Sequence, residues 1–129
     1  MKDMKGERLV TPGELQWRYF FDPKDGAIYD RLTGRRVDKV YAAPGPYHAY
    51  ARYRQVTVPL TTGGFVRIDA HRMVWAAAHG RWPDEGMDID HLNADVHDNR
   101  PANLAEVTEA ENTRRGRIKR FVYLLQTAP

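Results

Sequence analysis

The sequence contains no cysteine and no serine among its 129 residues. Without cysteine the chain cannot form disulfides, bind zinc through thiolates or use a cysteine nucleophile. Without serine it cannot perform serine-based acyl transfer. A catalytic site in this chain must therefore use histidine, carboxylates, asparagine, lysine, tyrosine, threonine or a bound metal ion.

Long hydrophobic runs are also missing. No apolar stretch approaches the length that crosses a bilayer, and the N-terminal sequence MKDMKGERLV lacks the apolar segment of a secretory signal. The chain length and the 42% content of hydrophobic residues suit one domain with a modest core. We therefore expect one soluble domain that has no membrane partner and is located in the cytoplasm.

Charge is distributed unevenly along the chain. Residues 81–111 hold nine acidic and two basic side chains, a local balance of −7, so the remainder must carry +10 to give the overall +3. The segment TRRGRIKR, residues 113–120, has five basic positions and no acidic one. Such a segment is typical of a polyanion-binding edge or of a solvated helix face, and charge alone leaves both interpretations open.

The first half of the chain has the pattern of short strands joined by tight turns. Residues 1–12 are polar and are expected to form a loose, flexible tail. Aromatic and β-branched runs at residues 15–21 and 27–30 are separated by turns rich in Gly and Pro, which is typical of strands. Residues 53–68 alternate apolar and polar side chains around a TTGG turn and predict a hairpin, in which the proline favours an edge strand.

One central helix is predicted at residues 70–79. Its apolar positions follow helical spacing, Asp69 stands at the capping position, and Gly80 follows the last residue. The loop before the hairpin, residues 41–54, carries several tyrosines. These rings could stack on nucleic-acid bases, although burial against the sheet is the more common role of such side chains.

A strand, a long loop, a second strand and a helix are predicted after residue 86. The segments MDIDH (87–91) and LAEV (104–107) have strand patterns, and the loop between them is rich in Asn, Asp and Pro. Thr108 and Glu111 have the spacing of a capping box, which starts a helix. The C-terminal apolar run FVYLL fits a helix or a strand, so its structure stays undecided.

Four polar side chains fall on this unit at positions that can converge. Asp90 and His91 end its first strand and Asn112 begins its helix, so folding can bring them over one cavity. The oxygens of Asp90 and Asn112 are hard ligands that suit Mg²⁺ or Mn²⁺. His91 has a reference pKa near neutrality and can accept a proton from water, while Asn103 can tie the loop that orients it. Each residue alone more often has a structural role, so the joint spacing carries the hypothesis.

This stretch resembles the HNH endonuclease family, whose motif folds as the ββα-metal finger, and specifically its bacteriophage branch. The segments FFDPKDGAIYDRLTGRRV, IDAHRMVWAAAHGRWP, IDH, DNRPANL and TEAEN occur in this order in such proteins. The resemblance implies that His91 is the general base, that Asn103 orders the loop, and that Asp90 and Asn112 bind one divalent metal ion, Mg²⁺ or Mn²⁺. No structural zinc is expected because the cysteine pairs of zinc-bearing relatives are absent. The sequence NLA departs from the usual NLR, so Ala105 lacks one basic side chain.

Six further residues are candidates for the site or for DNA contact. Arg100 fits either a phosphate clamp or a salt bridge to a loop carboxylate. Three arginines follow the predicted helix start and can track the DNA backbone, and two histidines can lie in the surroundings of the site or have structural roles. The arginines are Arg114, Arg115 and Arg117, and the histidines are His71 and His97.

The resemblance implies a phage-encoded HNH endonuclease that hydrolyses double-stranded DNA in the bacterial cytoplasm, alone or with a phage protein partner. A catalytically silent DNA-binding module with the same fold is the alternative. An RNA-binding β-rich domain that uses the tyrosines of residues 41–53 is a third hypothesis, but it leaves the spacing of the four polar side chains unexplained. The residues give no indication of oligomeric state.

The expected fold class is α+β, a small mixed domain with N-terminal β-hairpins, one central helix and a C-terminal ββα-metal finger. Residues 13–129 are expected to form a single HNH nuclease domain. Its parts are a β-rich region (13–69), the helix with the ββα motif (70–113), and a tail that is first basic and then apolar (114–129).

Overall fold

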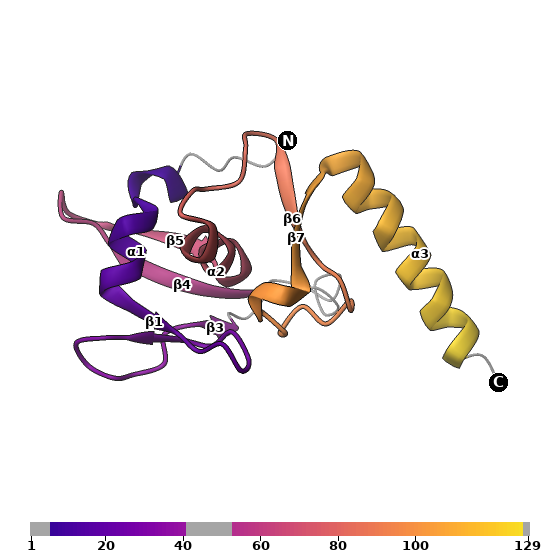
Figure 1. Cartoon of the computed structure of the whole chain (residues 1–129), viewed down its shortest axis with the longest axis horizontal. Helices are drawn as coiled ribbons and strands as arrows, with labels where there is room; N and C mark the ends of the chain where they lie inside the picture. Colours follow the sequence, from indigo (N-terminus) through magenta and orange to yellow (C-terminus); the bar gives the residue numbers. More distant parts are fainter. Residues whose placement is uncertain (1–5, 41–52, 128–129) are drawn as a thin grey trace.

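The computed structural model describes residues 6–40 and 53–127 (Figure 1). Most of the tyrosine-bearing loop, including His48, lies outside the described residues. The elements are η1 (Glu7–Leu9), α1 (Pro12–Arg18), β1 (Tyr19–Phe21), β2 (Ile28–Asp30), β3 (Lys39–Val40), β4 (Arg54–Pro59), β5 (Phe65–Asp69), α2 (Ala70–His79), β6 (Met87–His91), η3 (Pro101–Asn103), β7 (Leu104–Thr108) and α3 (Glu109–Thr127). The expected α+β class is confirmed.

Glu7 and Val10 are buried in the stretch 6–10, although the sequence predicts a loose tail there. Val10 is fully buried, and its carbonyl accepts a hydrogen bond of 2.8 Å from the Trp82 indole. The Glu7 carboxylate accepts bonds of 2.8 and 2.7 Å from the Arg72 guanidinium, and both side chains are buried. The tail prediction is wrong for this stretch because the partners that bury it lie more than sixty residues later in the chain.

A helix precedes the first strand, which the sequence prediction missed. The Thr11 hydroxyl accepts a hydrogen bond of 3.1 Å from the Glu14 backbone N–H, and proline occupies the first turn of α1. Threonine followed by proline is a typical helix start. The strand predicted over LQWRYFF therefore begins only at Tyr19. Leu15 and Tyr19 are both buried in the hydrophobic core.

The N-terminal strands form two small antiparallel sheets. β1 pairs with β2, and the second sheet has the order β3-β4-β5, with the predicted hairpin formed by β4 and β5. β4 is thus the central strand, and the edge position predicted from Pro59 is wrong for the strand as a whole. Pro59 is nevertheless tolerated because β3 pairs only with Arg54 and Gln55, at the other end of β4.

Helix α2 has the predicted bounds and lies at the centre of the fold. Gly80 ends it in the left-handed conformation with φ of +73°, where a residue without a side chain is favoured. Asp69 stands at the capping position without a side-chain cap bond, and its carboxylate instead accepts a 2.9 Å bond from the Gln55 amide. Met73 and Val74 pack into the main hydrophobic cluster, and α2 contacts β4, β5 and β6. The helix thereby joins the N-terminal sheet to the C-terminal unit.

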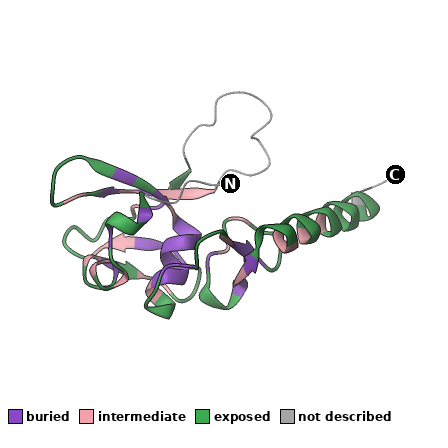
Figure 2. Cartoon of the chain, turned by 90° about the horizontal axis from the view of Figure 1, so that it is seen from above, coloured by how far each residue is buried: buried purple, intermediate pink, exposed green. Residues whose placement is uncertain are grey.

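The C-terminal unit is a ββα arrangement, as predicted. β6 and β7 are antiparallel and place His91 opposite Leu104, and the Thr108 hydroxyl accepts a 3.1 Å bond from the Glu111 N–H at the start of α3. α3 continues to Thr127, so the undecided C-terminal run is helical. Figure 2 shows α3 extending from the body with a mostly exposed surface. No helix in the described ranges is both long enough and apolar enough to cross a membrane.

Candidate functional site at the end of strand β6

Asp90 and His91 end strand β6 and are both buried. The Asp90 side chain faces α3, where the Lys119 ammonium donates a hydrogen bond of 2.6 Å to its Oδ1 and another of 2.6 Å to the His91 carbonyl. The Arg115 guanidinium lies 3.6 Å from Asp90 Oδ2. Two cationic groups of α3 therefore surround the carboxylate that the sequence predicts as a metal ligand.

Asn112 also lies where α3 packs against β6, a contact that we call the β6–α3 seam. Its amide nitrogen donates a 3.0 Å hydrogen bond to Asp88 Oδ2. Asp88 and Asp90 share one face of the strand because side chains two residues apart point to the same side. The seam thus gathers carboxylate and amide oxygens from Asp88, Asp90 and Asn112, of which the sequence prediction named only the last two.

The His91 imidazole is enclosed by two rings. The Tyr53 ring is nearly parallel to it, with the centroids 6.0 Å apart and an interplanar angle of 15°. The His71 ring lies 4.9 Å away at 51°. His71, a candidate for the surroundings of the site, is therefore in contact with the predicted base.

Burial lowers the pKa of His91, and the hydrogen bond between its Nε2 and Asn99 Oδ1, at 2.7 Å, acts in the opposite direction with smaller effect. A lowered pKa keeps the imidazole neutral at neutral pH, which is the form that can accept a proton. Burial raises the pKa of Tyr53, so the phenol beside it is also neutral. His91 is thus held as a neutral ring in a buried setting.

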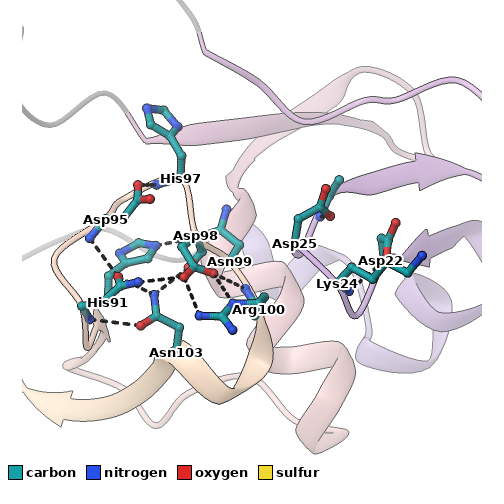
Figure 3. Close-up of polar contacts among 12 residues, drawn as sticks. Asp22, Lys24, Asp25, His91, Asp95, His97, Asp98, Asn99, Arg100 and Asn103 are labelled. Atoms are coloured by element: carbon teal, nitrogen blue, oxygen red, sulfur yellow. Dashed lines mark hydrogen bonds and ion pairs between the residues drawn. The ribbon is translucent and has the colours of Figure 1, made fainter.

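Asn103 ties together the loop that follows His91 (Figure 3). Its amide donates bonds of 2.9 Å to Asn93 Oδ1 and 2.8 Å to the Asp98 carbonyl, and its Oδ1 accepts a 3.0 Å bond from the Asn93 N–H. Its backbone carbonyl accepts a 2.8 Å bond from the Leu92 N–H. These bonds join the two ends of the loop that follows His91.

The candidate arginines occupy different surroundings. Arg100 forms a bidentate pair with Asp98, with two bonds of 2.8 Å, and this pair lowers the pKa of Asp98 to about 2. Arg114 and Arg117 are exposed on α3, whereas Arg115 faces Asp90. The described geometry therefore leaves two of the three helix arginines open to a large anion.

His97 is exposed on the loop, and its backbone N–H donates to Asp95. Figure 3 shows its ring directed away from His91 and Asn103. Of the two histidines predicted near the site, His71 is brought to His91 and His97 is not.

The residues at Asp90 fit a divalent cation. Asp90 Oδ2 is buried and has no hydrogen-bond partner among the described residues. Arg115, 3.6 Å away, is too distant to donate one, so the oxygen keeps a lone pair that a closer cation can satisfy. The ranges described contain no cluster of three His, Cys, Asp or Glu side chains able to hold a metal. A site with so few protein ligands suits Mg²⁺, which keeps several waters and shares its shell with substrate phosphates. Lys119 occupies the other oxygen of Asp90, so a cation there must compete with the ammonium.

Four residues of the site were missed by the sequence prediction, and Asp88 is one of them. Asn99, buried beside His91, belongs to the DNRPANL segment but has the appearance of a turn residue. Lys119 follows Asn112 by seven residues, a spacing that repeats one helix face and could have been detected. The sequence around Tyr53 did not indicate a contact with His91, because the two residues are far apart in the chain, with helix α2 between them.

Comparison with known proteins supports the family resemblance in part of the chain. Residues 69–114 match the model of the HNH endonuclease family. A solved structure, described as "DNA binding and cleavage by the HNH homing endonuclease I-HmuI", is similar with a TM-score of 0.58 and 20% identity. The match covers 92% of this chain and 57% of that one, so the chain spans little more than half the length of I-HmuI. No curated protein matches the chain.

These matches confirm the predicted resemblance and the fold. At 20% identity the structural likeness concerns the fold alone. The family match begins at Asp69, immediately before α2, and ends at Arg114 in α3. It therefore includes Asp90, His91, Asn103 and Asn112, but not Lys119.

Proposed function

Because residues 69–114 carry the HNH endonuclease motif, we propose that this chain is a metal-dependent endonuclease that hydrolyses phosphodiester bonds of double-stranded DNA. The observation that supports this proposal best is the pairing of a buried neutral imidazole with a buried, incompletely satisfied carboxylate at the end of one strand. That pair supplies a proton acceptor next to a cation-binding oxygen. Metal-assisted hydrolysis of a phosphodiester uses both.

In the proposed reaction, His91 takes a proton from the attacking water. Tyr53 and His71 hold its ring in place, and Asn103 keeps the following loop closed. Asp90 and Asn112, with Asp88 beside them, would hold the divalent ion. When bound, the ion would stabilise negative charge on the phosphate and on the leaving 3′ oxygen. The expected products have 5′-phosphate and 3′-hydroxyl ends.

Arg114 and Arg117 are the proposed contacts to the DNA backbone. Both are exposed and line one open hollow of α3 together with Glu109, Ala110 and Thr113. Arg114 is paired with Glu111 at 2.7 Å, but an exposed pair of this kind is weak and can exchange for a phosphate. The acidic residues before α3 would repel DNA from the site until a cation is bound, so metal and DNA are expected to bind cooperatively.

Incubation with supercoiled plasmid tests the proposal. Nicked or linear product is expected with Mg²⁺ or Mn²⁺, and none with EDTA. Cleavage that survives EDTA would contradict the metal requirement. DNA binding without any cleavage, in every divalent metal tried, would instead establish the alternative function, a catalytically silent DNA-binding module.

A further inference from the structure

Asn99 is a fully buried polar side chain in the loop after β6, and its amide oxygen lies 2.7 Å from His91 Nε2. An amide oxygen has lone pairs and no proton, so it can only accept a hydrogen bond. With the amide oxygen turned toward the ring, this hydrogen bond requires the imidazole to carry its proton on Nε2. A neutral imidazole has one proton, which leaves Nδ1 as the nitrogen with a free lone pair.

We infer that Asn99 is a positioning residue that holds His91 in the Nε2–H tautomer and thereby makes Nδ1 the proton acceptor of the proposed reaction. The inference rests on the proposed role of His91 as the general base. It adds the tautomer of that base and the residue that selects it.

Among the residues that the structure describes, Asn99 is the hydrogen-bond partner of the His91 ring. Tyr53 is nearly parallel to the imidazole, and His71 is tilted against it, so both restrict the ring plane. Ring contacts of this kind do not determine which nitrogen is protonated. Lys119 approaches the backbone carbonyl of His91 and not its ring. Selection of the tautomer therefore depends on the hydrogen bond to Asn99.

Asn99 is itself fixed by the turn between β1 and β2. A Cβ atom on Gly26 would lie 2.1 Å from the Asn99 carbonyl carbon and 2.2 Å from its oxygen, so only glycine permits this close approach. Gly26 has φ of +76°, a second reason for glycine at this position. Figure 3 shows this turn, with Asp22, Lys24 and Asp25, next to the loop that carries Asn99.

Several hydrogen bonds hold the conformation of this turn, so it can act as a support. The Gly26 N–H donates a 2.7 Å bond to the Asp22 carbonyl, and the Asp22 N–H donates a 2.8 Å bond to the Ala27 carbonyl. The Asp22 and Asp25 side chains accept further backbone bonds of 2.9 Å within the turn. Through Gly26 and Asn99, the N-terminal hairpin thus contributes to the orientation of a residue more than sixty positions later.

The test combines histidine ¹⁵N NMR with kinetics. In wild-type protein at neutral pH, His91 is expected to show one tautomer, protonated on Nε2, while the exposed His97 serves as the averaged reference ring. Asn99→Leu removes the acceptor at similar size and should convert the His91 signal to tautomer averaging. Asn99→Asp keeps an acceptor oxygen and should restore the single Nε2–H form.

The rate of DNA cleavage by each variant should change in parallel with the tautomer of His91 seen by NMR. Asn99→Leu is expected to lower kcat roughly 10- to 100-fold, the range found for partners that orient a histidine, with KM changed little. Asn99→Asp should recover part of kcat. A wild-type spectrum with His91 protonated on Nδ1, or already averaged, overturns the inference without any variant. If the wild type shows the Nε2–H form but cuts no DNA, the proposed function fails and the tautomer assignment stands.

Discussion

At the scale of single residues, the loop after His91 depends on carboxylates that remain ionised. Arg100 holds the pKa of Asp98 at about 2, and Asp98 also accepts a 2.7 Å bond from Asn93, which is joined to Asn103. A carboxylate with a lowered pKa contributes stability that is present above the unfolded pKa of about 3.9 and is lost as the pH falls through about 2. The loop clamp should therefore persist in mildly acidic solution.

The Asp98 pKa can be measured directly. In an NMR titration of side-chain carboxyl carbons, Asp98 is expected to have a midpoint of about 2 in the wild type. Arg100→Ala removes the largest cause of the shift and should move this midpoint upward. A midpoint that does not respond to loss of Arg100 would show that the pair is absent in solution, and would make Arg100 a better candidate for a phosphate contact.

At the scale of elements, α3 has two different basic sides. Arg115 and Lys119 face Asp90 on β6, whereas Arg114 and Arg117 face solvent. The sequence prediction treated the helix arginines as one group because their charges are equal. Their positions around the helix separate them, so the two sides should have separable effects on metal binding and on DNA binding.

Replacement of Arg114 and Arg117 by alanine should weaken binding to all DNA sequences alike. The slope of log affinity against log salt should flatten by up to about one unit for each lost phosphate contact. Arg115→Ala is the matched control on the same helix and should flatten the slope less, since its side chain faces Asp90 and is less exposed than those of Arg114 and Arg117. Equal slopes in wild type and the double variant would identify the exposed side as a solvated face.

Lys119→Met should increase the affinity of the free protein for Mn²⁺. The Lys119 ammonium donates a 2.6 Å hydrogen bond to Asp90 Oδ1. A metal ion at Asp90 must therefore displace the ammonium or bind against its electrostatic repulsion. A hydrogen bond to a charged group contributes on the order of 1.5–3 kcal/mol, which corresponds to roughly 10- to 100-fold in affinity. Mn²⁺ binding followed by electron paramagnetic resonance, without DNA, measures this effect. Arg120→Met, an exposed change on the same helix, is the control, and equal affinities for both variants would contradict the competition.

At the scale of the whole molecule, a buried ion pair joins the N-terminal segment to helix α2. Glu7 and Arg72 are both nearly inaccessible, and Arg72 also donates a 3.1 Å bond to the Met87 carbonyl at the start of β6. Removal of one partner leaves a buried charge unpaired. The N-terminal segment therefore stabilises the strand that carries the site.

Glu7→Ala is expected to lower the free energy of unfolding by about 3–5 kcal/mol in urea denaturation. Asp84→Ala removes the exposed, 3.5 Å pair with Arg81 and should change it by at most about 1 kcal/mol. A loss for Glu7→Ala no larger than that for Asp84→Ala would mean that the N-terminal segment is loose in solution, as the sequence composition suggested.

The elements that were predictable from the sequence have local causes. The bounds of α2 follow from apolar spacing and Gly80, and the start of α3 follows from Thr108 and Glu111. The position of Asp90 and His91 at the end of β6 also follows from a local cause, the alternation of apolar and polar residues in this strand.

What was missed depends on contacts between distant segments. Glu7 pairs with Arg72, Gly26 packs against the Asn99 backbone, and the Tyr53 ring contacts the His91 ring. None of these contacts produces a periodic pattern in the sequence. Helix α1 was a different kind of error, because Thr11 and Pro12 did give a local start signal that was interpreted as a loop. The placement of Asn112 against Asp88 could not be inferred from spacing, since both aspartates lie on one face of the strand.

The most direct test of the account compares plasmid cleavage and DNA binding by the wild type, His91→Ala and His97→Ala in Mg²⁺ or Mn²⁺. His91→Ala should abolish cleavage and leave DNA affinity within a few-fold, because His91 is buried and is placed as the proton acceptor. His97→Ala changes an exposed imidazole on the same loop and should cut like the wild type. Cleavage by purified His91→Ala at the wild-type rate would contradict the assignment of the catalytic site.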